Sequence, residues 1–283
     1  MATITSTTTE KPAPRANQAR NARAEIDRHR RWAPARAALW GLLDRQLPAG
    51  ARVAVLGAGN GDDLPLRQLA GRASSLTLID LDRQALRAAR RRAGWRRRRR
   101  VRVVEHEVTG GAADRIAMAA LAGEEPSPPL VPEGPLPGAP YDLVVGDLLY
   151  SQLLYPALLD LGLEEARREA VLQRRGLALT GAVVARLHAS APLVLHLHDP
   201  LAWWPGHDQP ADLGSILRLA DGGDVAAALA EVDRGAGPWE SDPRAAFAEL
   251  GIDPITTAFW RWPFAAGVDY LVCATLATGS ELP

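Results

Sequence analysis

The sequence predicts a doubly wound α/β fold with a mostly parallel sheet. Short apolar runs rich in branched residues alternate with helical patterns along most of the chain. The run Val53–Leu56 leads into a glycine-rich turn, and the next run, 76–79, ends in Asp80. Runs of this kind are typical of parallel strands covered on both faces, and ligands bind where such strands end.

Strands are expected where apolar, branched residues gather between turn signals. Pro263 to Gly267 leaves only a short connection between the last two of them, which predicts an antiparallel pair. The expected strands are 52–56, 75–80, 101–105, 142–145, 193–197, 255–262 and 268–276.

Helices are expected between these strands, some of them with capping residues at their starts. Asp62 and Asp63 can cap the helix that begins near Leu64, with Pro65 tolerated in its first turn, and Asp82 can cap the next helix. The expected helices are 63–71, 83–93, 111–122, 151–160, 163–174, 178–189, 211–234 and 243–250.

Composition divides the chain into a tail, a helical segment and one large domain. Residues 1–19 are rich in Thr, Ala and Pro and predict a disordered tail, whereas 20–48 has a helical pattern that Pro34 should split near Ala33. Residues 49–279 form the expected domain. Within it, the proline- and glycine-rich segment 123–140 predicts an irregular exposed loop, either a surface insertion or a lid.

Charge and cysteine content exclude several classes of protein. The 283 residues have a formal net charge of zero, which does not favour nucleic acid or a membrane as a partner. The single cysteine, Cys273, excludes a disulfide framework within the chain and a multi-cysteine zinc site. Without a long apolar stretch or an apolar signal core, we expect a soluble cytoplasmic protein.

The glycines after the first strand indicate which ligand the fold binds. Gly57, Gly59 and Gly61 stand at alternate positions, where glycine allows a sharp turn and close approach of the backbone to a ligand. A dinucleotide-binding loop would have its third glycine where this chain has Asp62. Acidic residues there would repel a pyrophosphate but suit a ligand with a cationic amino-acid end, such as S-adenosylmethionine.

Asp80 is the second half of this signal. A carboxylate at the end of the second strand can accept hydrogen bonds from both ribose hydroxyls of an adenosine ligand. Alternatively, Asp80 and Asp82 only cap the following helix. The spacing of 23 residues between Gly57 and Asp80 favours the ribose role.

With Val55–Gly61 as its glycine motif and Leu78–Asp82 as its acidic loop, the chain resembles the class I S-adenosylmethionine-dependent methyltransferases over roughly residues 50–277. The resemblance implies a seven-stranded sheet closed by the final hairpin, N-terminal helices near the cofactor cleft and methyl transfer. It departs from the common pattern at Val55, two residues before Gly57, where many members carry an acid that Asp62 could replace. The implied cofactor-binding residues are Gly57, Ala58, Gly59, Gly61, Asp62, Asp80, Leu81, Glu107, Val108 and Asp147.

Glu107 occupies the position at which the resembled family contacts the exocyclic amine of adenine, with Val108 as a wall of the pocket. A carboxylate is a suitable acceptor for an amino group. A capping role for Glu107 in the turn that follows is the alternative.

Asp147 and Tyr150 follow the fourth strand, where the resembled family places its chemistry. Family members that methylate amines carry an acid or amide, two prolines and an aromatic ring there, and this chain keeps the acid and the ring. The alternative is that Asp147 caps a helix and Tyr150 is core. His198, at the end of the fifth strand, is the third catalytic candidate, and its pairing with His196 is too small a ligand set to predict a metal site.

The favoured function is methyl transfer from S-adenosylmethionine to a small-molecule acceptor, with an amine nitrogen as one option. The arginine run within 90–102 suggests a nucleic-acid substrate instead, although a solvated loop is the favoured explanation, because the run lies between a helix and the third strand, away from the strand ends that hold the cofactor. A nicotinamide-dependent oxidoreductase and a catalytically silent protein that binds an adenosine ligand also stay open at this point. The sequence does not predict an oligomeric state.

Overall fold

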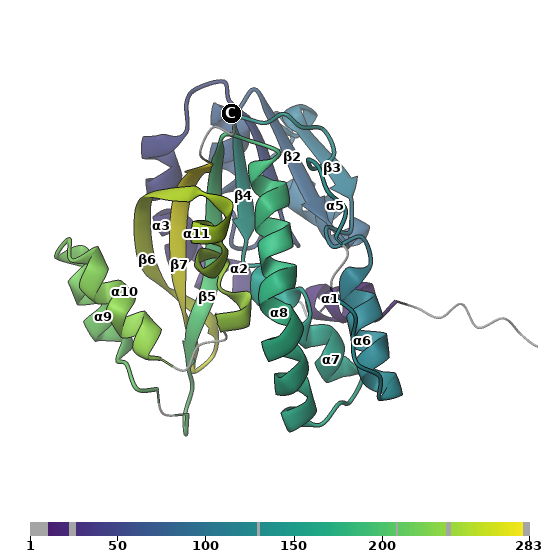
Figure 1. Cartoon of the computed structure of the whole chain (residues 1–283). Helices are drawn as coiled ribbons and strands as arrows, with labels where there is room; N and C mark the ends of the chain where they lie inside the picture. Colours follow the sequence, from purple (N-terminus) through teal and green to yellow (C-terminus); the bar gives the residue numbers. More distant parts are fainter. Residues whose placement is uncertain (1–10, 23–26, 129–130, 208, 236–238, 280–283) are drawn as a thin grey trace, which may run out of the picture.

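The computed structural model describes residues 11–22, 27–128, 131–207, 209–235 and 239–279. Their strands form one seven-stranded sheet in the order β3-β2-β1-β4-β5-β7-β6 (Figure 1). All strand pairings among β1, β2, β3, β4 and β5 are parallel, whereas β7 runs antiparallel to both β5 and β6. The predicted sheet and its closing hairpin are confirmed. The strands are β1 Arg52–Leu56, β2 Ser75–Asp80, β3 Val101–Glu105, β4 Leu143–Asp147, β5 Leu193–Trp203, β6 Ile252–Ala265 and β7 Val268–Gly279.

Helices cover both faces of this sheet (Figure 1). The helices are α1 Pro12–Ala22, α2 Arg28–Arg31, α3 Ala33–Gln46, α4 Leu66–Arg72, α5 Arg83–Arg92, α6 Ala112–Ala122, α7 Tyr155–Asp160, α8 Glu165–His188, α9 Leu213–Asp221, α10 Val225–Arg234 and α11 Phe247–Leu250. Among the described residues, no helix is both long and apolar enough to cross a membrane.

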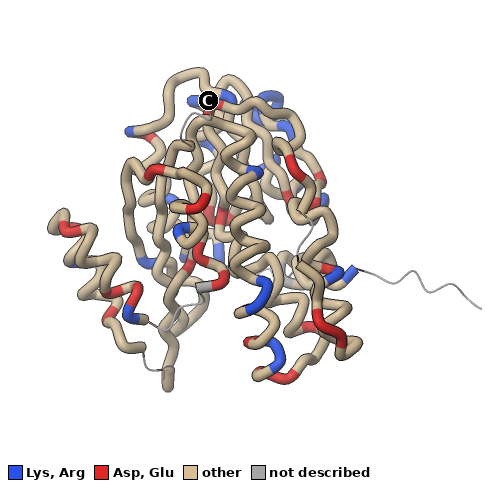
Figure 2. The backbone as a smooth tube through the Cα atoms, viewed as in Figure 1, with Lys and Arg blue, Asp and Glu red and all other residues tan. Residues whose placement is uncertain are grey.

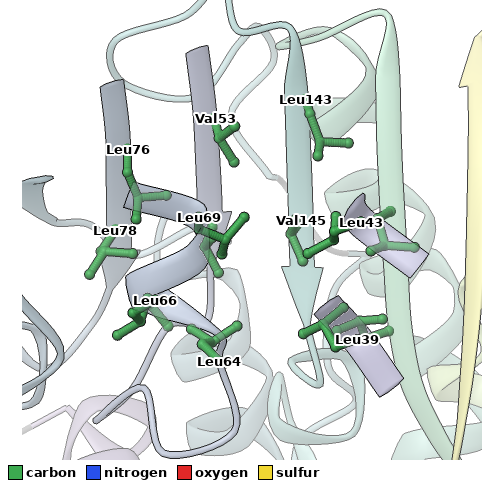
Figure 3. Close-up of a cluster of buried hydrophobic side chains, with 14 of the residues drawn as sticks. Leu39, Leu43, Val53, Leu64, Leu66, Leu69, Leu76, Leu78, Leu143 and Val145 are labelled. Carbon is green, nitrogen blue, oxygen red and sulfur yellow. The ribbon is translucent and has the colours of Figure 1, made fainter. Parts of the chain in front are cut away.

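Alternation along the strands divides the core into two layers. On β1, Val53 and Val55 pack with helices α3, α4 and α5, whereas Ala54 and Leu56 pack with α6, α7 and α8 on the other face. Figure 3 shows the first layer, in which leucines of α3 and α4 lie against the central strands. Each fully buried leucine or valine contributes about 1.5–3 kcal/mol through removal of apolar surface from water. These two layers hold the strand ends in fixed positions.

The N-terminal segment differs from the prediction. Residues 12–19, expected in a disordered tail, belong to α1, which contacts α6 and α7 at the carboxyl ends of the strands (Figure 1). Polar contacts to distant residues hold it there: the Ala13 N–H donates to Asp114, and Asn17 donates to Asp80. Residues 1–10 of the predicted tail lie outside the described part. The predicted break near Ala33 is confirmed, because α3 begins there with a proline in its first turn.

Helix α8 is continuous where two helices were predicted. The pattern suggested a break between 174 and 178, but Gly176 lies within the helix. A Cβ built on Gly176 would lie 2.6 Å from the Cβ of Glu240, so the glycine allows the segment 239–241 to pack closely on the helix. Close packing, and not termination, therefore explains this glycine.

Three further segments differ in detail from the expectations. The predicted helix 211–234 divides into α9 and α10, and Asp224 caps the second of these. The described part of 123–140 has no helix or strand, as expected, yet it is pinned to the core because Leu136 is buried and its N–H donates to Ser190. The helix expected at 63–71 begins only at Leu66 and has no side-chain cap.

Gly176→Ala should lower the free energy of unfolding by about 1–3 kcal/mol, because the added methyl group overpacks the contact with Glu240. Gly181 lies in the same helix, and a Cβ there would meet Ala246 at an ordinary 3.5 Å. Gly181→Ala should therefore leave stability unchanged or raise it by up to about 1 kcal/mol. Urea denaturation of both variants tests the assignment, and equal effects would contradict it.

Candidate functional site

A cavity of about 510 Å³ lies at the carboxyl ends of β1, β2 and β4. Helix α1 and the β6–β7 pair complete its walls. All ten residues predicted to bind the cofactor line this cavity: Gly57, Ala58, Gly59, Gly61, Asp62, Asp80, Leu81, Glu107, Val108 and Asp147. The structure thus brings together residues from four separate strand ends.

The glycine turn needs its glycines for conformation and for space. Gly57, Gly59 and Gly61 all have positive φ, which side chains disfavour. A Cβ on Gly57 would lie 2.8 Å from the carbonyl oxygen of Asp147, and one on Gly61 would lie 2.5 Å from a methyl group of Leu66. The turn can therefore press against β4 on one side and α4 on the other.

Asp80 organises the turn from the neighbouring strand. Its carboxylate accepts hydrogen bonds from the Gly59 N–H at 2.8 Å, from the Asp82 N–H at 2.9 Å and from the Asn17 side chain at 2.9 Å. Burial raises the pKa of Asp80, although these three donors oppose the shift. Asp82, which was weighed as a cap together with Asp80, caps α5 by accepting from Gln84 and Ala85.

Asp62 lies in an ion-pair cluster that the sequence did not reveal. Arg28 binds one carboxylate oxygen through Nε at 2.9 Å and Nη2 at 2.6 Å, and Arg92 binds the other. Burial alone would raise the pKa of Asp62, but the hydrogen bonds from Arg92 and Arg28 outweigh it and hold the pKa below its ordinary value. Asp62 therefore anchors the glycine turn instead of capping the next helix.

The arginine run was expected either as a solvated loop or as a nucleic-acid patch. Arg92, at the end of α5, instead reaches back to the cavity and binds Asp62. Figure 2 shows many of the chain's basic residues gathered at the upper end of the view, where the parallel strands begin. Trp95 is 72% exposed and stands apart from the core. The run as a whole therefore does not line the cavity.

Asp147 is the least compensated acid of the cavity. It is 4% exposed, and its Oδ1 has no hydrogen-bond partner among the residues that the structure describes. Burial raises the pKa of Asp147 well above its ordinary value, and the charges of Asp63 and Asp80 raise it further. Burial also raises the pKa of Asp63 to about 6, with Asp62 adding to the shift. A cation in the cavity would relieve this repulsion.

The residue that follows Asp147 has a strained backbone conformation and also lines the cavity. Leu148 has a φ of +49°, which makes it the non-glycine residue with positive φ in the described part of the chain. Its N–H donates to the Leu197 carbonyl at 3.1 Å. Such left-handed residues cost of order 1–3 kcal/mol and cluster at functional sites.

Glu107 lines the cavity, but its carboxylate is occupied. One oxygen accepts from the N–H of Thr109 at 2.8 Å and from its hydroxyl at 2.7 Å, and the other accepts from the Gly111 N–H. This is the capping role that the sequence left open. The contact with adenine remains a prediction.

Two of the three catalytic candidates do not reach the cavity lining. The Tyr150 hydroxyl pairs with Nδ1 of His196 at 2.5 Å in the core beneath the site. His198 is buried beside Asp242, 3.4 Å from its carboxylate. Only Asp147 of the three lines the cavity. Within the described residues, no group of His, Cys, Asp and Glu side chains is arranged to hold a metal ion.

Four aromatic side chains form one wall of the cavity, and we call them the aromatic wall: Trp32, Trp262, Phe264 and Tyr270. Trp32 and Trp262 are only 6% and 5% exposed, and they also belong to the buried core. The sequence does indicate that Trp262 and Phe264 lie on the same face of one strand, because they are two residues apart. Their proximity to Trp32 could not be anticipated, because more than 200 residues separate them.

Comparison with known proteins adds little to this geometry. No protein-family model matches the chain, and no curated protein matches it. Among solved structures, magnesium protoporphyrin IX methyltransferase from Synechocystis PCC 6803 with bound SAH is 14% identical with a TM-score of 0.43, over 93% of each chain. A SAM-dependent methyltransferase from Aquifex aeolicus is 12% identical with a TM-score of 0.41, over 93% of this chain and 97% of that one. At these values the similarity does not assign an activity to this chain.

Asp147→Asn should raise the free energy of unfolding at pH 8 by about 1–3 kcal/mol. The folded-state pKa of Asp147 lies above its unfolded value, so the wild type loses stability as pH rises toward that pKa. The gain should become small near pH 4, close to the ordinary Asp pKa of about 3.9, and vanish near about pH 2, where both states are protonated. Urea denaturation between pH 4 and 8 measures it.

Asp62→Asn is the matched comparison and should have the opposite sign. The lowered pKa of Asp62 means that ionisation stabilises the fold above its unfolded pKa, so the variant should be less stable at neutral pH by about 1–3 kcal/mol. The difference should shrink as pH falls below 4. A loss of stability in both variants at pH 8 would contradict the assignment of Asp147 as uncompensated.

Proposed function

We propose that the chain is an S-adenosylmethionine-dependent methyltransferase that acts on a small-molecule acceptor. The observation that supports this proposal is that the glycine turn, Asp80 and Asp147 line the same cavity, which is rich in carboxylates. A volume of about 510 Å³ is within the range of ligand pockets, roughly 300–1,000 Å³. The cofactor class itself comes from the sequence resemblance.

The residues of the cavity fit the parts of this cofactor. The bare backbone of Gly57 and Gly59 allows close approach, and Asp80 can accept from ribose hydroxyls. Leu81 and Val108 offer apolar contacts to adenine, with Glu107 as the predicted acceptor for its amino group. When bound, the cofactor supplies an activated methyl group.

The protein's contribution is then alignment and exclusion of water, which supply much of the acceleration of a transfer reaction. Asp147 is the side chain at the cavity that can accept a proton or a hydrogen bond from an acceptor amine. Tyr150 and His198 keep only an indirect role in this proposal, since they pack beneath the site.

Charge argues against a nicotinamide dinucleotide as the ligand. Five carboxylates line the cavity, and among the described lining residues Arg28 is the only arginine or lysine. Arg28 is already paired with Asp62. A pyrophosphate would meet repulsion there, whereas a cationic ligand meets attraction.

Nucleic acid is the second candidate acceptor, and the arginine run is the observation that favours it. Arg92 serves the fold by binding Asp62, and the segment 93–100 lies away from the cavity. A small-molecule acceptor therefore agrees better with the arrangement of charge.

Calorimetric titration with S-adenosylhomocysteine, with NADH as the comparison ligand, tests the proposal. We expect binding of the thioether and none of NADH. Binding of NADH alone would favour an oxidoreductase. Binding of the thioether without methyl transfer to any acceptor would favour a silent adenosine-binding protein.

Asp80→Ala should weaken binding of S-adenosylhomocysteine by about a hundredfold, because two hydrogen bonds from ribose to a charged group are lost. Asp142→Ala is the matched control. Asp142 also accepts a backbone N–H, that of Arg52 at 2.6 Å, but it precedes β4 at the opposite end of the sheet. Unchanged affinity in Asp80→Ala, or equal losses in both variants, would contradict the site.

A further inference from the structure

The strand order separates the proposed cofactor contacts from the aromatic wall. Asp80 ends β2, the glycine turn follows β1 and Asp147 ends β4, in the spatial order β2-β1-β4. Three of the four rings of the wall come from β6 and β7, on the far side of β5. A ligand that extends from Asp80 to Asp147 therefore leaves the wall available to a second ligand.

Contacts among the rings make the wall a single packed surface. Trp32 and Trp262 meet edge to face with their centroids 4.8 Å apart, and Phe264 lies 5.0 Å from Trp262 and 5.1 Å from Tyr270. Trp262 and Tyr270 are direct partners in the β6–β7 register. These geometries are in the favourable range for aromatic pairs, so the wall is formed before a ligand arrives.

Hydrogen bonds join the N-terminal segment that carries Trp32 to the end of β6 that carries Phe264. The indole N–H of Trp32 donates to the Phe264 carbonyl at 3.1 Å. Arg31 donates to the same carbonyl at 2.8 Å and to the Pro263 carbonyl at 3.1 Å. The N-terminal segment and the β6–β7 pair thus form one rigid side of the cavity.

The cation preference comes from carboxylates elsewhere in the cavity, since the charged groups at the wall itself are Arg28 and Arg31. Asp147 has its unpartnered oxygen, and Asp63 also lines the cavity. Aromatic faces attract cations, as the Arg28 guanidinium 5.1 Å above the Trp32 ring illustrates. The indole N–H of Trp262 is also buried and has no hydrogen-bond partner among the described residues.

We propose that the aromatic wall and Asp147 form the acceptor site, and that the acceptor is an amine with an aromatic body that is a cation at neutral pH. The ring of the acceptor packs on the wall, and its nitrogen lies toward Asp147, which takes the proton that the ammonium must lose before its lone pair can attack the methyl group. The new N–C bond forms as the bond from that methyl group to sulfur breaks, and the thioether leaves. This inference rests on the proposed function, because a methyl-acceptor site has a role only in a methyl-transferring enzyme.

Three indole compounds of nearly equal size test this assignment: tryptamine, which is a cation, tryptophol, which is neutral, and indole-3-propionate, which is an anion. Calorimetric titration at pH 7.5 without cofactor should show tryptamine binding at least about tenfold more tightly than tryptophol, and indole-3-propionate most weakly. Equal affinities for the three compounds would overturn the proposal.

Substitutions in the wall and at Asp147 distinguish the contribution of aromatic packing to amine affinity from the contribution of charge. Phe264→Ala should weaken tryptamine and tryptophol by similar factors, because Phe264 is 39% exposed and its side chain contributes only to the wall. Asp147→Asn should abolish the preference for tryptamine over tryptophol. Trp262→Leu should act like Phe264→Ala with a larger effect, and Phe264→Ala remains informative if this buried substitution prevents folding.

S-adenosylhomocysteine titrated into the same variants distinguishes the two proposals. Phe264→Ala should leave its affinity within about threefold of the wild type. A parallel loss of thioether and amine affinity would place the wall in the cofactor site and overturn this inference alone. Tight thioether binding without amine preference would do the same, whereas amine preference without thioether binding would overturn the proposed function.

Discussion

Crowding of carboxylates at the carboxyl ends of the parallel strands is the constraint on which the architecture around the cavity depends. Asp62 is balanced by two arginines, Asp80 by two backbone N–H groups and Asn17, and Glu107 by the turn before α6. Each balance also fixes a segment of backbone: α2 and α5, the glycine turn and α1, and the start of α6. Asp147 is left without such a partner, and this makes it the place where a ligand can complete the charge balance.

The first three strands were predicted to the residue, because apolar runs are followed by glycines or acids, whereas β5 continues to Trp203 beyond the expected 197. The ten residues predicted to bind the cofactor line one cavity, because parallel strands end at one edge of the sheet. The expected break in α8 between 174 and 178 was wrong, and Gly176 lies there within the helix. A glycine that ends a helix and a glycine that permits close packing cannot be told apart in a sequence. The tail composition likewise concealed α1, which is held by long-range contacts such as Asn17 with Asp80.

The strand pattern did not predict which of the three catalytic candidates reach the cavity. His198 was expected at the end of the fifth strand, but β5 continues to Trp203, and both His198 and Tyr150 are buried. The arginine run shows the reverse case, because one member of a compositionally biased stretch, Arg92, forms a specific buried contact. The aromatic wall required tertiary knowledge, since its members come from opposite ends of the sequence.

The position of β7 has a consequence for the order of assembly. This strand is the nearest to the carboxyl end of the sequence, yet it lies between β5 and β6 and supplies Tyr270 to the cavity. During synthesis β6 emerges before the strand that joins it to the sheet, so it has no neighbour to pair with until β7 leaves the ribosome. The cavity therefore closes late in folding, and a nascent chain that already carries the glycine turn and Asp147 still lacks the side of the site on which Trp32 rests.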